Sequence, residues 1–255
     1  MVKSPIDAPA ELQRAAELLF KNWMLALPTA LASLIIGILA LFAFGTVFAS
    51  AMAGGLVAGR TGAGLAAVLA ALPMLALYLV IAGVLTILAQ AIVIHAAEDA
   101  WEGRPLDFGR SLSVATSRLV PLIGAFILVG LVMIIPVALM VVLIGFLLLL
   151  VAAFFLMYVL PAVVLGDQGA AGALTESYRI ARENVVPSLI AFIGIIVAAV
   201  LGGIINGLLH HGAILSLLGS LIVGGFVSAY IALVSARFYM LLRGSSTVAV
   251  QAPMA

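Results

Sequence analysis

Four long stretches of this chain contain no Asp, Glu, Lys or Arg, and they limit strongly what it can fold into. They cover residues 22–59, 61–97, 119–166 and 184–236. A helix rises about 1.5 Å per residue and crosses the hydrocarbon core of a bilayer in about 20 residues. The first two stretches therefore fit one crossing each. The last two are too long for one crossing and must fold back as hairpins, so six spans are predicted.

The predicted fold is an all-α bundle of six transmembrane helices in a single membrane domain over residues 1–255. The spans are expected at about 23–48, 67–95, 119–137, 139–161, 187–208 and 214–240. Glycine-rich segments predict two of the turns. These segments are Ala53-Gly54-Gly55 with Gly59-Arg60-Thr61-Gly62, and Asn206-Gly207 with His210-His211-Gly212. The turn between the third and fourth spans is expected near Pro136.

The composition agrees with a membrane protein and excludes two other classes. The chain is 66% hydrophobic and 8% charged, whereas a soluble domain is about 45–50% apolar and about 25% charged. A water-soluble globule is therefore excluded. The net charge of +1 is too small for a nucleic-acid-binding protein that works by neutralising phosphates. We expect no cleavable signal peptide, because charged residues interrupt the first 22 positions.

The cationic residues fall almost entirely on one side of a six-span arrangement. Of the 11 Lys and Arg residues, Arg60 lies on the opposite side from the rest. The other ten are Lys3, Arg14, Lys21, Arg104, Arg110, Arg118, Arg179, Arg182, Arg237 and Arg243. By the positive-inside rule, both termini are expected in the cytoplasm, with the protein in the inner or plasma membrane of the cell.

A threefold internal repeat is also predicted. Residues Ser111–Phe126 match Ser177–Phe192 at an offset of 66, and the spacing of Leu12, Ala16, Leu19 and Trp23 matches the same apolar stripe. Such a stripe is typical of an amphipathic helix. Each unit would be a cytoplasmic interfacial helix followed by two spans, at about 5–97, 104–165 and 170–243. Residues 244–255 are expected to form a flexible tail.

One segment resembles a known family. The pattern Pro161-Ala162-Val163-Val164-Leu165-x-Asp167-x-Gly169, followed by Ala173-Leu174-x2-Ser177-x4-Arg182, is similar to the membrane-domain family fused to some glycerophosphoryl diester phosphodiesterases. That family includes stand-alone six-span relatives. The likeness covers about residues 5–243 in layout and about 161–187 in motif, with Gly166 where the family usually carries an acidic residue. It implies the fold; the soluble phosphodiesterase barrel has no counterpart here.

Two groups of polar residues contain side chains that can bind a metal. His95, Glu98, Asp99, Glu102 and Asp107 have the spacing for a ligand pair on one helix face. We expect instead a solvated helix end with Arg104 and Arg110 as counterions, and no metal. Similarly, His210-His211 is expected to be an exposed polar turn, because neighbouring residues on a helix point about 100° apart.

The arginines are the remaining candidate binding residues. Arg237 lies slightly inside the apolar zone, and we expect it to form a structural ion pair with Glu98, Asp99 or Asp167. A contact with lipid phosphate is the alternative, because arginine matches phosphate bidentately. The interfacial helices would bring further arginines to the level of the headgroups. These candidates for anionic lipid are Arg110, Arg118, Arg179 and Arg182.

The sequence contains no recognisable catalytic motif and none for a cofactor. The expected function is therefore non-catalytic, organising membrane lipids or a partner protein at the cytoplasmic face. The alternative is a transporter or permeation pathway for an apolar or lipid-like substrate, which would need few charges inside the membrane. A third option, a membrane enzyme, would require a metal at the cluster between His95 and Asp107.

Overall fold

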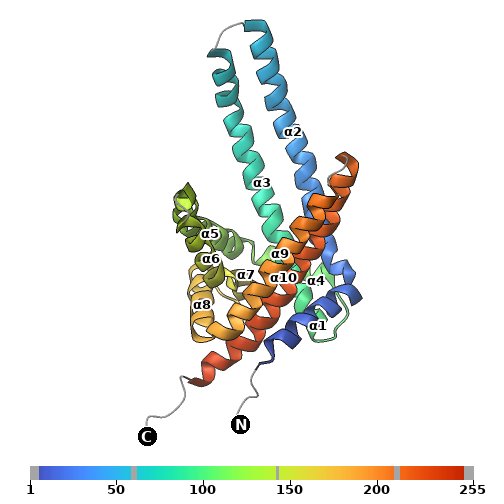
Figure 1. The fold of residues 1–255 in the computed structure, drawn as a ribbon, viewed down its shortest axis with the longest axis vertical. Coiled ribbons are helices and arrows are strands. Elements are labelled where there is room, and N and C mark those ends of the chain that lie inside the picture. Colours follow the sequence, from blue (N-terminus) through green and yellow to red (C-terminus); the bar gives the residue numbers. More distant parts are fainter. Residues whose placement is uncertain (1–5, 59–61, 142–143, 210–212, 250–255) are drawn as a thin grey trace.

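The computed structural model describes residues 6–58, 62–141, 144–209 and 213–249 (Figure 1). This part of the chain folds into helices and contains no strand. Six of its segments are long and apolar enough to cross a membrane, which confirms the predicted number of spans. They are Trp23–Gly45, Leu72–Trp101, Leu119–Val141, Ile144–Val164, Val185–Leu208 and Gly219–Arg243.

The long helices are arranged as three consecutive pairs. In the first pair, α2 (Leu27–Ala58) follows a short 3₁₀ helix η1 (Trp23–Ala26) and packs against α3 (Gly62–Trp101). In the second, α5 (Leu119–Ala138) packs against α6 (Ile144–Leu156), which is continued by α7 (Val159–Val164). The third pair consists of α9 (Val185–Leu208) and α10 (Ala213–Ala249).

A short helix precedes each pair. These helices are α1 (Ala8–Lys21), α4 (Phe108–Ser117) and α8 (Ala170–Glu183). Asp7 and Asp107 cap the first two, since each carboxylate accepts a hydrogen bond from the backbone N–H three residues later. Each helix buries a small residue at its centre: Ala15, Ser111 and Ser177. The three lie toward the end of the molecule where the chain termini are drawn, which we call the base (Figure 1).

Several expected boundaries are corrected by the structure. Asn206-Gly207 lies inside α9, within a candidate span, where a continuous helix satisfies the backbone hydrogen bonds that lipid cannot. Ala53-Gly54-Gly55 lies inside α2, beyond the span that ends at Gly45, because glycine is tolerated inside a helix. Helix α5 continues past Pro136 to Ala138, and the 3₁₀ turn η2 (Leu139–Val141) follows. The expected turn residues at 59–61 and 210–212, which include the pair His210-His211, lie outside the described residues.

The ends of other elements also differ from expectation. The second short helix was expected from about residue 104 but begins at Phe108, and Pro105 precedes its cap, Asp107, by two residues. Helix α10 continues to Ala249, into the segment that was expected to be a flexible tail. Residues 250–255 lie outside the described part of the chain.

The hydrophobic core lies at the base. The buried apolar residues are concentrated near the ends of the second helix of each pair: from Ile87 to Ala100 in α3, from Tyr158 to Val164 around α7, and from Ala229 to Leu242 in α10. Away from the base, α2 and α3 project beyond the other helices and present many large apolar side chains to their surroundings (Figure 1). The tertiary contacts that position polar groups are therefore made at the base.

Candidate functional site

The outward face of α8 carries two arginines beside a cavity. Arg179, Arg182, Thr175, Tyr178 and Glu183 line this cavity of about 490 Å³. The opposite face of the helix is buried, because Ala173, Ser177, Ile180 and Ala181 face the core. Arg179 is half-buried and Arg182 is exposed. The packing of α8 therefore presents both guanidinium groups on the same side of the helix.

These two arginines differ from the other arginines that the structure describes. Arg179 and Arg182 form no ion pair or hydrogen bond with any described residue, whereas each of the others has an acidic partner within 4.0 Å. The paired arginines are Arg14 and Arg237 with Glu11, Arg104 and Arg110 with Asp99, Arg118 with Asp167, and Arg243 with Glu176. The α8 pair therefore retains its capacity to bind an anion from outside the chain.

The expected partners of Arg237 are wrong. Arg237 of α10 donates a hydrogen bond from Nε to Glu11 of α1 at 2.7 Å. Its guanidinium also lies over the ring of Trp101, 4.6 Å from the centroid. Of the predicted partners, Asp99 pairs with Arg104 and Asp167 pairs with Arg118. No ion pair of Glu98 occurs among the described residues. Arg237 thus ties α1 to α10 through a pair that is largely buried, with 25% of the arginine and 11% of the glutamate side chain exposed.

The cluster from His95 to Asp107 is only in part the solvated helix end that was expected, since Glu102 and Asp107 are exposed but the helix face with His95 and Asp99 is not. His95 and Asp99 are buried, and His95 Nδ1 lies 3.0 Å from the Ser111 hydroxyl of α4. The expected counterions are present, since Arg104 Nε lies 2.7 Å from Asp99 and Arg110 lies at 4.0 Å. The hydrogen bond from Arg104 to Asp99 raises the pKa of the guanidinium. No group of three potential metal ligands occurs among the described residues. These contacts join α3 to α4.

A third set of contacts joins α8 to α10. Tyr239 donates a hydrogen bond to the buried carboxylate of Glu176 at 2.9 Å, and Arg243 lies 3.7 Å from the same carboxylate. Arg243 also donates to the carbonyl oxygens of Leu165 and Gly166, just after α7. The short helices α1, α4 and α8 are thus each fixed to a long helix by polar groups that are at least partly buried.

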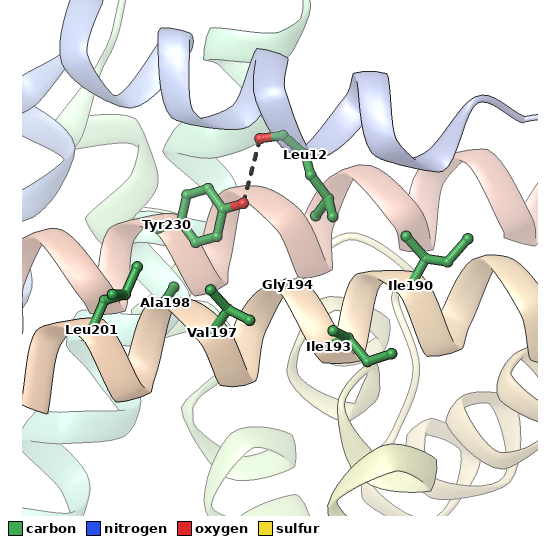
Figure 2. Close-up of a pocket in the computed structure, with 8 residues that line it drawn as sticks. All are labelled: Leu12, Ile190, Ile193, Gly194, Val197, Ala198, Leu201 and Tyr230. Atoms are coloured by element: carbon green, nitrogen blue, oxygen red, sulfur yellow. Dashed lines mark hydrogen bonds between the residues drawn. The ribbon is translucent and has the colours of Figure 1, made fainter.

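An apolar groove runs beside α1. Figure 2 shows Leu12 of α1 and Tyr230 of α10 facing a row of side chains along α9. The row consists of Ile190, Ile193, Gly194, Val197, Ala198 and Leu201, and the groove has a volume of about 480 Å³. The Tyr230 hydroxyl donates to the Leu12 carbonyl oxygen at 3.4 Å. A Cβ at Gly194 would lie 2.8 Å from Leu12, so the glycine makes room for that side chain. We call this site the α1–α9 groove.

A second apolar groove lies beside α4. Its walls are formed by residues of α2 between Leu27 and Ile35 and residues of α3 between Leu85 and Ile92. Phe108 and Leu112 of α4 complete it, and its volume is about 580 Å³. We call it the α2–α4 groove. Both volumes are within the range of about 300–1,000 Å³ that is typical of small-molecule sites.

Comparisons with known proteins give no further guidance. No family model, curated protein or solved structure matches the chain. The geometry of the base and of the two grooves therefore carries the functional argument.

The sequence identified part of this site. Arg179 and Arg182 were predicted as lipid-contact residues, and the structure places them together on α8 with no ion pair to the residues it describes. Arg118 and Arg237 were predicted alongside them but pair inside the protein, and Arg110 lies near Asp99. Sequence reasoning missed the grooves entirely, because they depend on which helices become neighbours. Glu11 was missed as a partner because it lies 226 residues from Arg237.

Proposed function

We propose that this chain is a non-catalytic membrane protein that binds anionic lipid headgroups at its cytoplasmic face through Arg179 and Arg182. The observation that carries the proposal is that neither forms an ion pair or hydrogen bond with the described residues, beside a cavity on α8. A basic residue near an anionic membrane surface contributes about 1 kcal/mol. Two such residues give about 2 kcal/mol, or roughly 30-fold in affinity. The protein would thereby organise lipid, or a partner held with it.

The proposal includes a threefold repeat with α1, α4 and α8 as interfacial helices. Support comes from the junctions that follow these helices. Asn22, Arg118 and Asn184 occupy equivalent positions, directly before the first long segment of each unit. The amide groups of Asn22 and Asn184 each donate to the carbonyl four residues earlier, at 3.1 Å. The same local geometry at equivalent positions is expected of repeated units.

The proposal also includes the orientation of the protein in the membrane, with the base on the cytoplasmic side. The arginines on α4 and α8, the arginines near the end of α10 and the cation at the end of α1 are all at the base. With the base in the cytoplasm, these cations face the leaflet that carries anionic lipids. The resemblance to the membrane domains fused to phosphodiesterases is compatible with such a role, since those domains accompany enzymes of lipid-derived substrates.

Removing both α8 charges should weaken retention of anionic lipid. We expect the double variant Arg179→Gln/Arg182→Gln to retain less phosphatidylglycerol in native mass spectrometry, by roughly 30-fold, with phosphatidylcholine retention unchanged. The control is Arg14→Gln/Lys21→Gln, which removes the same charge from α1; we expect a smaller loss of anionic lipid there, because Arg14 is already paired with Glu11. If both double variants lose anionic lipid equally, or neither does, α8 is not the site.

One observation favours a second candidate function, a pathway for a lipid-like substrate. The two apolar grooves lie along segments long enough to span the membrane, and they open between helices. A permeation pathway would move fluorescent phospholipid between leaflets of reconstituted vesicles, whereas a lipid-organising protein would leave the leaflets unmixed.

A further inference from the structure

The two grooves occupy equivalent positions in the proposed repeat. Four residues of α2 and four of α9 line them with the same spacing, and each pair of residues is 162 positions apart. The same separation relates Leu12 to Leu174 in the apolar stripes of the short helices. The pairs are Pro28 with Ile190, Leu31 with Ile193, Ala32 with Gly194, and Ile35 with Val197. The grooves are therefore a feature of the architecture and not of one local sequence.

The short helices contribute equivalent residues as well. Leu12 of α1 lines one groove and Phe108 of α4 lines the other, and they share a position in the repeat. The α2–α4 groove thus lies between the first long helix of the first unit and the short helix of the second unit. The α1–α9 groove lies between the first long helix of the third unit and the short helix of the first unit. The remaining boundary of this kind is between α5 of the second unit and α8 of the third unit. There, the position equivalent to Pro28 and Ile190 is Gly124. A Cβ there would lie 3.0 Å from the Cβ of Ala170 in α8.

The lining of the grooves indicates what fills them. The lining side chains of α2, α3, α9 and α10 belong to membrane-spanning segments, and Leu12, Phe108 and Leu112 come from the short helices at the base. All of them are apolar apart from the Tyr230 hydroxyl, which is directed to the Leu12 carbonyl oxygen. The medium at this depth is hydrocarbon. An empty apolar groove would forfeit the dispersion contacts of its walls. An occupant with polar groups at this depth would leave them unsatisfied.

The length of the grooves matches one leaflet. Along α9 the lining runs from Ile190 to Leu201, a rise of about 16 Å, and along α2 it runs from Leu27 to Ile35, about 12 Å. One leaflet contributes half of a hydrocarbon core that is about 30 Å thick, or about 15 Å. We propose that each groove binds one acyl chain of a membrane phospholipid from the leaflet nearest the base. This lipid site is separate from the headgroup site on α8.

Photolabelling with a zwitterionic lipid tests this assignment. The full chain is reconstituted in phosphatidylcholine vesicles that contain a trace of phosphatidylcholine with a diazirine in one acyl chain. After irradiation, labelled peptides are mapped by mass spectrometry. We expect labels to concentrate at residues 27–35 and 190–201 rather than on equally lipid-facing segments, such as the one around Leu77, which is 60% exposed.

Variants that fill each groove separate specific binding from general lipid contact. Ala198→Trp should abolish the excess label at 190–201 and leave that at 27–35, and Ala32→Trp should do the reverse. Ala199→Trp is the matched control, because Ala199 is exposed on the same helix but does not line the groove. The variant Arg179→Gln/Arg182→Gln should label as the native chain does, so failure of the headgroup proposal would not affect this result.

Three outcomes would overturn the assignment. One is labelling that follows exposure alone along α2, α3 and α9. Another is an equal effect of Ala198→Trp and Ala199→Trp. The third is evidence that a second copy of this chain, and not an acyl chain, occupies the α2–α4 groove. The chain contains no cysteine, so Leu31→Cys introduces a unique thiol in the α2–α4 groove, and efficient disulfide dimers of that variant in vesicles would show that a protein surface fills the groove instead.

Discussion

At the scale of single residues, Gly166 shows how close packing at the base restricts the sequence. This glycine lies two residues after the end of α7, against the hydroxyl of Tyr239 from α10. A Cβ at this position would overlap that hydroxyl and lie 2.5 Å from the Ala162 carbonyl oxygen. Tyr239 in turn donates to Glu176 of α8. A side chain at position 166 would therefore disturb the contact between α8 and α10.

We expect Gly166→Ala to lower the free energy of unfolding by about 1–3 kcal/mol, because overpacking in a close-packed region forces its neighbours to shift. Thermal or denaturant unfolding in detergent measures the effect. Gly169→Ala is the control for the added methyl group, since a Cβ at Gly169 meets nothing within 4 Å. Gly169 is the N-cap of α8, where alanine is less favourable than glycine, so we expect a loss there that is smaller than at Gly166. Equal stability of the two variants would contradict the packing argument.

The ion pairs illustrate which residue contacts a sequence can predict. Asp99 and Arg104 are five residues apart, and their pairing was expected from the local charge cluster. The pair between Glu11 and Arg237 joins the first helix to the last. Sequence spacing carries no information about such a contact, because its geometry is set by how α1 crosses α10. The arginine was therefore identified as an ion-pairing residue with the wrong partner.

At the scale of elements, the break between α6 and α7 depends on a side chain from another helix. The Ser177 hydroxyl of α8 donates to the Phe155 carbonyl oxygen at 2.6 Å and accepts from the Tyr158 backbone N–H at 3.2 Å. These two backbone groups lie where the helix is interrupted, and lipid offers them no partners. Ser177 therefore stabilises the break and holds α8 against it.

Replacing Ser177 by Ala should cost about 1–3 kcal/mol of stability, since it leaves two buried backbone groups unsatisfied. Unfolding in detergent is again the measurement. Ser113→Ala is a suitable control, because Ser113 is exposed on α4 and its hydroxyl makes no hydrogen bond with the described residues. A stability loss of the same size in both variants would show that the Ser177 bridge contributes nothing specific.

At the scale of the whole molecule, the predicted orientation places the three short helices on one side of the membrane. Ser113 on α4 and Thr175 on α8 are exposed at the base, and Val141 is exposed in the turn after α5. Because the chain contains no cysteine, single substitutions at these positions give unambiguous probes.

In right-side-out membrane vesicles, we expect a membrane-impermeant maleimide to label Val141→Cys. Ser113→Cys and Thr175→Cys should become labelled only after the membrane is permeabilised. The physical reason is the strong preference of Lys and Arg near spans for the cytoplasmic side. Labelling of one of the two base positions, but not the other, in intact vesicles would overturn the six-span arrangement and the lipid-binding role with it.

The sequence by itself determined the class of fold and the position of its spans. Apolar stretches of fixed length must cross a slab of fixed thickness, so six helices and their approximate limits follow from the order of the residues. It predicted turn positions less well, because glycine and proline are tolerated inside membrane helices: α2 continues through Gly54 and α5 continues past Pro136.

Only the tertiary structure decided which polar groups remain available and where apolar grooves form. Both depend on contacts between helices that are far apart in the chain: Glu11 neutralises Arg237, while Arg179 and Arg182 form no ion pair or hydrogen bond with the described residues. Likewise, Leu12 meets α9 because α1 packs against α9 and α10. Helix periodicity indicates which face of a helix is apolar, but the neighbour that covers this face is fixed by packing.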